Sequence, residues 1–245
     1  MKSFKYLSLV IIAISLGLTS CWELDDIDGN GKIVHEFRSV SGFDGVSSEG
    51  DYDVFITESA SSDYEVEVIT DENLISYVST RVSGNTLIIS NTSRHSIKGS
   101  ARITVYIKTP YVEYINISGS GTMTCDNVNH DSMEANISGS GYISLYGLNT
   151  KNISARIAGS GEIEMRGYSK TANFEIMGSG QIRGYSNHGR LETDTCSVNI
   201  SGSGEAHVYV NNQLNAYIAG SGQIFYRGNP VLHTVTSGSG HIYRD

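Results

Sequence analysis

Four glutamates are the side chains whose type and spacing could act on a polysaccharide. Glu162 and Glu164 alternate along one expected strand, and Glu175 and Glu205 lie on neighbouring expected strands. If Glu162 and Glu205 share a column with Gln181 between them, they lie about 9.6 Å apart, near the carboxylate separation of inverting glycosidases. Outward acids on an acidic chain are usually solvated surface residues. We therefore expect no catalytic residue and no enzyme, with a polysaccharide-acting enzyme as the alternative.

Histidine and cysteine do not form a ligand pattern. The seven histidines fall at different positions relative to the expected strands, so no pair has the spacing of a metal site. Cys125 and Cys196 would lie four repeats apart, about 19 Å, which is too far for a disulfide. The sequence therefore predicts no metal, no cofactor, and two separate buried thiols.

A repeated tripeptide indicates the elements that position these side chains. Gly-Ser-Gly occurs seven times in the second half of the chain, at intervals of 18 to 24 residues. Around it, the apolar residues Ala135, Ile137, Ile143 and Leu145 alternate with polar ones, as in strands with one buried face. The period is too short for a propeller blade and lacks helical spacing. We predict an all-β fold, a parallel β-helix (β-solenoid) of about seven coils of roughly 20 residues.

The glycines of the tripeptide are predicted to be structural turns. Glycine is needed where φ is positive or where two backbones approach too closely for a Cβ atom. A phosphate-binding loop would instead need a helix after the glycines, and strand-like residues follow here. The predicted corner glycines are Gly119, Gly121, Gly139, Gly141, Gly159, Gly161, Gly178, Gly180, Gly202, Gly204, Gly220, Gly222, Gly238 and Gly240.

Residues 33–110 are expected to form a β-rich N-terminal part, separated by Pro110 from the repeats at 111–245. Within it only Asp71–Val78 could form a short helix. The other segments alternate and are rich in β-branched and aromatic residues, as strands are. The expected strands are Asp51–Ile56, Tyr64–Val68, Thr86–Ile89 and Arg102–Ile107.

The N-terminus predicts a lipoprotein of the bacterial cell envelope. Lys2 and Lys5 precede an apolar run at Tyr6–Leu18, which is shorter than the ~20 residues that span a membrane. The residues that end at Cys21 resemble a bacterial lipobox. That resemblance implies that residues 1–20 are a signal peptide and that Cys21 is lipidated. We expect an outer-membrane lipoprotein held to the membrane by its lipid, with exposure at the cell surface left open.

Residues 21–32 are acidic and are expected to be a tether. They resemble the signals that send Bacteroidetes lipoproteins to the surface. Asp26 and Asp28 also match a calcium loop in part, but Phe37 stands where that loop needs glutamate. Loss of the signal peptide's two lysines would change the formal net charge from −9 to −11. Such an acidic chain argues against a nucleic-acid partner.

Tyrosines among small polar residues are the candidate binding residues. This mixture suits contacts with surface glycans or proteins, although tyrosine also pairs well across strands for purely structural reasons. A purely structural envelope component therefore stays a further alternative to an adhesin. The tyrosines predicted to face outward are Tyr142, Tyr146, Tyr168, Tyr185, Tyr209, Tyr217 and Tyr226.

The last repeat ends close to the C-terminus. Only five residues follow Gly240, and none could form a capping helix. The final coil of a solenoid exposes unpaired backbone groups. We expect either that Tyr243 and Arg244 cover this end or that the chain forms a homo-oligomer.

The chain resembles a known family, the head GIN domain of auto-transporter adhesins (DUF2807), which is common in Bacteroidetes envelope proteins. The resemblance rests on Val40–Val46, Asp51–Ile56, Arg102–Ile107 followed by Pro110, and the Ile-Ser-Gly-Ser-Gly units, and it covers about residues 33–243. It implies a β-helical fold and an adhesin-like function without catalytic residues. The combined expectation is a non-catalytic, lipid-anchored β-helical protein that binds glycans or proteins.

Overall fold

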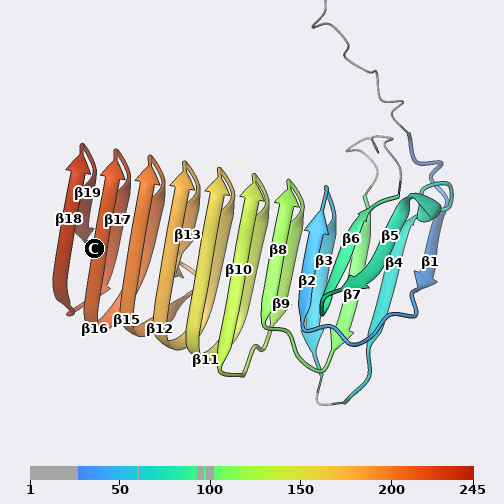
Figure 1. The fold of residues 1–245 in the computed structure, drawn as a ribbon, viewed down its shortest axis with the longest axis horizontal. Helices are drawn as coiled ribbons and strands as arrows, with labels where there is room; N and C mark the ends of the chain where they lie inside the picture. Colours follow the sequence, from blue (N-terminus) through green and yellow to red (C-terminus); the bar gives the residue numbers. More distant parts are fainter. Residues whose placement is uncertain (1–26, 60, 93–96, 98–101) are drawn as a thin grey trace, which may run out of the picture.

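The computed structural model describes residues 27–59, 61–92, 97 and 102–245 (Figure 1). It confirms an all-β fold built around a parallel β-solenoid. The strands are β1 (Ile33–Phe37), β2 (Gly45–Glu49), β3 (Asp53–Glu58), β4 (Glu65–Asp71), β5 (Val78–Ser83), β6 (Thr86–Asn91), β7 (Thr104–Thr109), β8 (Tyr114–Gly119), β9 (Thr122–Asp126), β10 (Ser132–Gly139), β11 (Tyr142–Gly159), β12 (Glu162–Gly178), β13 (Gln181–Arg183), β14 (Tyr185–Ser186), β15 (Gly189–Gly202), β16 (Glu205–Gly220), β17 (Gln223–Gly228), β18 (Val231–Gly238) and β19 (His241–Arg244).

Each repeat forms one flattened coil of two strands joined by its tripeptide. The strand before Gly-Ser-Gly lies in one sheet and the strand after it lies in the other, as Figure 1 shows. Neighbouring coils pair in parallel and in register, so that Gly119, Gly139 and Gly159 stack in one column. The long strands β11, β12 and β16 each continue from the second sheet of one coil into the first sheet of the next.

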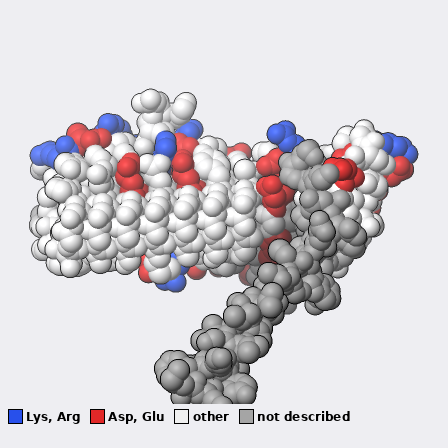
Figure 2. Space-filling model, turned by 90° about the horizontal axis from the view of Figure 1, so that it is seen from above, with Lys and Arg blue, Asp and Glu red and all other residues white. Residues whose placement is uncertain are grey.

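The two glycines of the tripeptide turn the corner for different reasons. Gly159 has a φ of 137°, a conformation that side chains rarely tolerate. Gly161 has no such φ, but a Cβ atom there would lie 2.7 Å from the carbonyl oxygen of Gly141 and 2.7 Å from Ile137. The same two conditions recur along the stack. Figure 2 shows the resulting ridge of corners, which is free of charged side chains.

The space between the two sheets is filled by ladders of apolar side chains. Ile137, Ile157 and Ile176 pair in consecutive coils and are all buried. Cys125 and Cys196 are buried there as free thiols, as expected, and burial raises the pKa of both. Because each ladder continues through the stack, the solenoid has one contiguous core.

The N-terminal part adds two coils to the same stack, but not in sequence order. The β2–β3 coil lies between the β6–β7 coil and the β8–β9 coil, with parallel pairing on both sides. Antiparallel strands then close this end, because β5 covers β6, β4 covers β7 and β1 pairs with β4. The expected short helix is a single 3-10 turn at Ile75–Tyr77. The outermost strands at this end, β1 and β5, are each antiparallel to the strand with which they pair.

Predictions for the extreme N-terminus lie mostly outside the described residues. This holds for the signal peptide, Cys21, Asp26 and the first half of the tether. The described end of the tether contacts the turn after β4, where Asn73 Nδ2 donates a hydrogen bond to the Asp28 carbonyl at 2.8 Å. Within the described ranges, no helix has the length and apolar character needed to cross a membrane.

The C-terminal end of the stack is open along β18. All eight residues of this strand are exposed, and Val231 and Val235 are 63% and 59% exposed. Arg244 does not cover the strand, since it donates hydrogen bonds to Gly228 and Asn229 of the preceding coil. Tyr243 stacks on Phe225 of that coil. The expectation that these side chains close the end is therefore wrong for β18, and the homo-oligomer stays a prediction.

The register can be tested with neighbouring substitutions. Ile163 is fully buried in its ladder, so Ile163→Asp should lower the free energy of unfolding by more than about 4 kcal/mol. Glu162 lies on the outer face in a partly exposed ion pair with Arg183, so Glu162→Ala should cost at most about 1 kcal/mol. Urea unfolding of both variants measures the difference. Similar midpoints would contradict the register.

Candidate functional site

The longest repeat forms the most irregular surface of the solenoid. The interval between Gly178 and Gly202 holds 24 residues, and β13 ends early within it. The extra residues form a hairpin, in which Tyr185 pairs with Arg190 and Ser186 with Gly189 in antiparallel fashion. The hairpin borders a groove of about 420 Å³ on the outer face of the sheet. We call this hollow the hairpin groove; its lining includes Gln181, Arg183, Tyr185, Ser186, Asn187, His188, Glu205, His207, Arg227 and Asp245.

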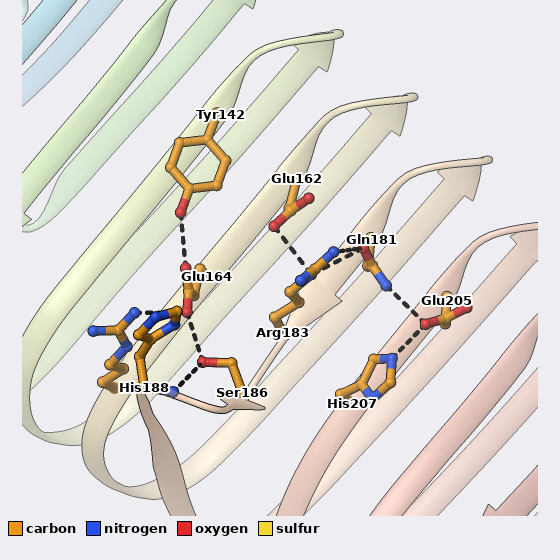
Figure 3. Close-up of polar contacts among 10 residues, drawn as sticks. Tyr142, Glu162, Glu164, Gln181, Arg183, Ser186, His188, Glu205 and His207 are labelled. Carbon is orange, nitrogen blue, oxygen red and sulfur yellow. Dashed lines mark hydrogen bonds and ion pairs between the residues drawn. The ribbon is translucent and has the colours of Figure 1, made fainter.

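The floor of the hairpin groove is a polar ladder in which each charge has a partner (Figure 3). Glu162, Gln181 and Glu205 occupy one column on neighbouring strands. Gln181 donates a hydrogen bond to Glu205 at 2.7 Å and accepts one from Arg183 at the same distance. Arg183 also pairs with Glu162 at 3.0 Å, and His207 contacts the Glu205 carboxylate. These contacts fix the orientation of the polar groups without a ligand.

Tyr185, His207 and Arg227 form the other wall of the groove. The Tyr185 ring meets His207 edge-on at a centroid distance of 5.2 Å, and His207 stacks on Phe225 at 4.8 Å. The Arg227 guanidinium lies 4.3 Å above the Tyr185 ring. Tyr185 also donates a hydrogen bond to Asp245 at 2.7 Å. Burial, and then this carboxylate, raise the pKa of Tyr185, so its hydroxyl stays protonated as a donor.

Glu164 ties the hairpin to the sheet. Its carboxylate accepts hydrogen bonds from Tyr142 at 2.8 Å, Arg166 at 2.9 Å and Ser186 of the hairpin at 3.0 Å. Burial by itself would raise the pKa of Glu164, but the hydrogen bonds from Arg166, Tyr142 and Ser186 outweigh it and hold this pKa below its ordinary value. Glu164 is therefore an ionised anchor for the hairpin.

The predicted outward tyrosines divide into separate environments. Tyr142 and Tyr146 lie beside the hairpin. The Arg166 guanidinium lies 4.4 Å from the centroid of the Tyr146 ring. Tyr185 lines the hairpin groove, and Tyr209 lines a smaller hollow of about 280 Å³ on the hairpin. The structure therefore brings two of the seven predicted tyrosines, Tyr185 and Tyr209, to the hairpin itself, and Tyr142 and Tyr146 are linked to it through Glu164 and Arg166.

The other three tyrosines lie elsewhere. Tyr168 donates a hydrogen bond to Asp194 at 2.9 Å, and Tyr217 is exposed on the opposite sheet. Tyr226 does not face outward, because it pairs with buried Val208 and packs against the core. The seven tyrosines thus do not form a single face.

The four glutamates also separate. Glu162 and Glu205 stand on either side of Gln181, as the repeat spacing predicted, and Glu164 lies beside them. Glu175 belongs to the other sheet, where it pairs with Arg156 at 2.6 Å. In the described part of the chain, no group of three or more His, Cys, Asp or Glu side chains could hold a metal ion.

Sequence reasoning missed several residues of the hairpin groove. Arg183, His207 and Arg227 were not among the candidates, and neither was Asp245, which reaches the groove from the last strand. The signal that could have located them is the one long interval between tripeptides, since extra residues in one coil must leave the regular stack.

Comparison with known proteins supports this architecture. The family model described as "Putative auto-transporter adhesin, head GIN domain" (DUF2807) matches residues 42–230. A solved structure described as a "putative lipid binding protein" from Parabacteroides distasonis is 28% identical, with a TM-score of 0.74, and covers 90% of this chain and 100% of its own. No curated protein matches the chain.

Two further structures, both described as a "putative adhesin", share the fold. That from Bacteroides fragilis is 19% identical, with a TM-score of 0.81, and covers 89% of this chain and 100% of its own. That from Parabacteroides merdae is 20% identical, with a TM-score of 0.69, and covers 90% of this chain and 99% of its own. Because the family model spans most of the solenoid and its N-terminal part, the chain belongs to the DUF2807 family of head GIN domains.

Proposed function

We propose that this protein is a lipid-anchored adhesin of the outer membrane that binds saccharide chains in the hairpin groove without altering them. The observation that carries the proposal is the groove itself, which combines the Tyr185 ring with fixed amide, carboxylate, imidazole and guanidinium groups. Binding sites of small ligands commonly have such a combination of apolar surface and a few convergent polar groups. The adhesin description of the family is in line with this function.

The geometry favours an uncharged saccharide over an acidic one. Both arginines of the groove are already paired, since Arg183 contacts Glu162 and Arg227 contacts Asp245 at 3.5 Å. The two arginines in these pairs are therefore not free to compensate the charge of a ligand carboxylate. The whole chain is also acidic, with a formal net charge of −9. An acidic polymer would be repelled on approach, whereas the hydroxyls of a neutral sugar can exchange hydrogen bonds with the carboxylate, amide and imidazole groups.

The electrostatics favour binding over glycoside hydrolysis. A general acid needs a carboxyl group whose pKa is raised, so that it stays protonated near neutral pH. The pKa of Glu164 is lowered instead, and its carboxylate oxygens accept hydrogen bonds from three donors. Glu162 and Glu205 are likewise engaged by Arg183, Gln181 and His207. The carboxylates are thus arranged as hydrogen-bond acceptors that orient a ligand.

Saccharide binding can be tested on the exported chain with residues 1–20 removed. Affinity electrophoresis in galactomannan, arabinoxylan, mixed-linkage glucan and alginate should show retention by at least one neutral polymer and none by alginate. Gln181→Ala and His207→Ala should each weaken this retention about tenfold, because each removes one fixed polar group of the groove. Tyr217→Ala, on the opposite sheet, is the control and should bind as the wild type does.

The enzyme alternative is tested in the same samples. Overnight incubation with each polymer should produce no new reducing ends. Release of reducing ends that Glu162→Gln or Glu205→Gln abolishes would show a hydrolase and contradict the proposal. Absence of retention by every neutral polymer would also contradict it.

The lipid anchor has its own test. In the native host, Cys21→Ala should remove the acylated residue, so that the protein no longer partitions into the detergent phase after export. The wild-type chain, expressed in parallel, should partition there completely. Equal partitioning of the two proteins would contradict lipidation at Cys21.

The Glu164 anchor should make stability depend on pH. Folding lowers the pKa of Glu164, so its ionised form stabilises the fold above its ordinary pKa, and this contribution is lost as the pH falls through the lowered value. Glu164→Gln should therefore cost about 2 kcal/mol at about pH 7 and much less at about pH 3. Thermal unfolding at both values measures this, with the exposed Glu65→Gln as control. An equal loss of stability at both values would contradict the ionised anchor.

A further inference from the structure

The connection from β7 to β8 crosses a coil to which it does not belong. β7 pairs with β3 and β8 pairs with β2, so the β2–β3 coil lies between the two ends of this connection. Residues 110–113, which we call the crossing connector, therefore advance by two ladder steps, about 9.6 Å along the solenoid. This segment contains no Gly-Ser-Gly tripeptide, so other contacts must fix its path.

Glu58, the last residue of β3, holds the crossing connector from the coil that it crosses. Its Oε1 atom accepts a hydrogen bond from the Val112 backbone N–H at 2.9 Å. The same oxygen contacts Nε2 of His130 at 3.1 Å, and His130 lies in the loop between β9 and β10. One carboxylate thus joins three segments that are distant in the sequence: the end of β3, the crossing connector and the loop after β9.

Both partners of this ion pair are shielded from water. The side chains of Glu58 and His130 are 13% and 9% exposed. Tyr111 of the crossing connector lies against His130, with ring centroids 4.6 Å apart. The pair between His35 and Glu67 differs, because its side chains are 59% and 21% exposed. A shielded pair interacts more strongly than one in contact with water, since the local dielectric constant is lower.

The other ionisable groups around this histidine are uncharged or have partners of their own. Those on the crossing connector, on β9 and in the loop itself are Tyr111, Glu113, Cys125, Asp126 and Asp131. The Tyr111 hydroxyl donates a hydrogen bond to Glu113, and Asp131 pairs with Lys151 at 2.7 Å. Burial raises the pKa of Cys125 and keeps its thiol uncharged. Glu58 is therefore the carboxylate that acts directly on the imidazole.

We propose that Glu58 and His130 form a pH-sensitive clasp, which holds the crossing connector firmly while the imidazole is protonated and loosens when the imidazole loses this proton. Burial alone would lower the pKa of His130, but the hydrogen bond and the charge of Glu58 outweigh it and raise this pKa. The folded chain therefore binds the proton more tightly than the unfolded chain. The stabilisation is fully present below the ordinary histidine value of about 6.5 and is lost as the pH rises through the raised value.

Loss of the proton weakens the clasp without removing every contact. A neutral imidazole can still donate a hydrogen bond from Nε2 to Glu58, but a positive charge no longer strengthens this bond. The ionised carboxylate keeps the hydrogen bond from Val112. The crossing connector is then held to the β2–β3 coil alone and no longer firmly to the loop after β9. Alkaline pH thus destabilises the junction between the out-of-order coil and the coil that follows it.

Nuclear magnetic resonance tests the clasp directly on the chain with residues 1–20 removed. The imidazole signals are followed while the pH is raised, and His130 is identified by its contact with the Tyr111 ring. Its titration midpoint should lie above the ordinary value of about 6.5, and Glu58→Gln should lower this midpoint because it removes the partner charge. A wild-type midpoint at or below about 6.5 would overturn the proposal. An unchanged midpoint in the folded Glu58→Gln variant would overturn it as well.

Thermal unfolding at one pH well below and one well above the measured midpoint shows what the proton does for stability. The Tm of His130→Gln should lie several degrees below that of the wild type at the lower pH and close to it at the higher pH, because glutamine can replace only the neutral donor. His35→Gln, which removes the exposed pair with Glu67, is the control and should follow the wild type at both values. An equal loss for His130→Gln at both values would show a purely structural contact and overturn the clasp. If this variant does not fold, the wild-type titration decides.

Discussion

Close backbone contact at the Gly-Ser-Gly corners is the constraint on which the rest of the solenoid depends. Coils can stack at the ladder spacing only if each corner accepts the corner before it. The φ of 137° at Gly159 and the contacts that a Cβ atom would make at Gly161 show why both positions need glycine. With the corners fixed, the two sheets keep one register, and every column of side chains follows from it. The apolar ladders and the polar ladder of the hairpin groove both result from this register.

The sequence predicted what the repeat determines and missed what departs from it. The alternation around Ile137 and Ile143 was sufficient to predict inward ladders, and the spacing placed Glu162 and Glu205 on either side of Gln181. Tyr226 was predicted wrongly because the end of its strand continues a buried column from Val208. The groove could not be predicted from the sequence, because the hydrogen bond between Tyr185 and Asp245 joins residues that are 60 positions apart. The order of the N-terminal coils was equally hidden, since pairing between distant segments leaves no local pattern.

Irregular segments carry the chemistry of this molecule. A uniform stack presents flat faces and an uncharged ridge of corners (Figure 2), which offer few convergent groups. The hairpin in the 24-residue interval breaks this uniformity and brings Ser186 to Glu164 and Tyr185 to His207. The antiparallel strands at the other end have a similar effect, because pairing of β4 with β7 and β1 extends the outer face on which the exposed rings of Phe37, Phe55 and Tyr106 lie. Regular coils thus supply a rigid spacer between two distinct surfaces.

The position of the β2–β3 coil has a consequence for the route by which the chain folds. This coil comes early in the chain, yet both of its neighbours, β6–β7 and β8–β9, are formed by later residues. The two edges of this coil can pair only when residues up to Asp126 have joined the stack. Forming these pairings between distant segments is the slow, entropically costly step. Every later coil needs only the coil before it and can add rapidly in order. Folding of the chain is therefore expected to pass one early barrier and then to proceed in one direction toward the C-terminus.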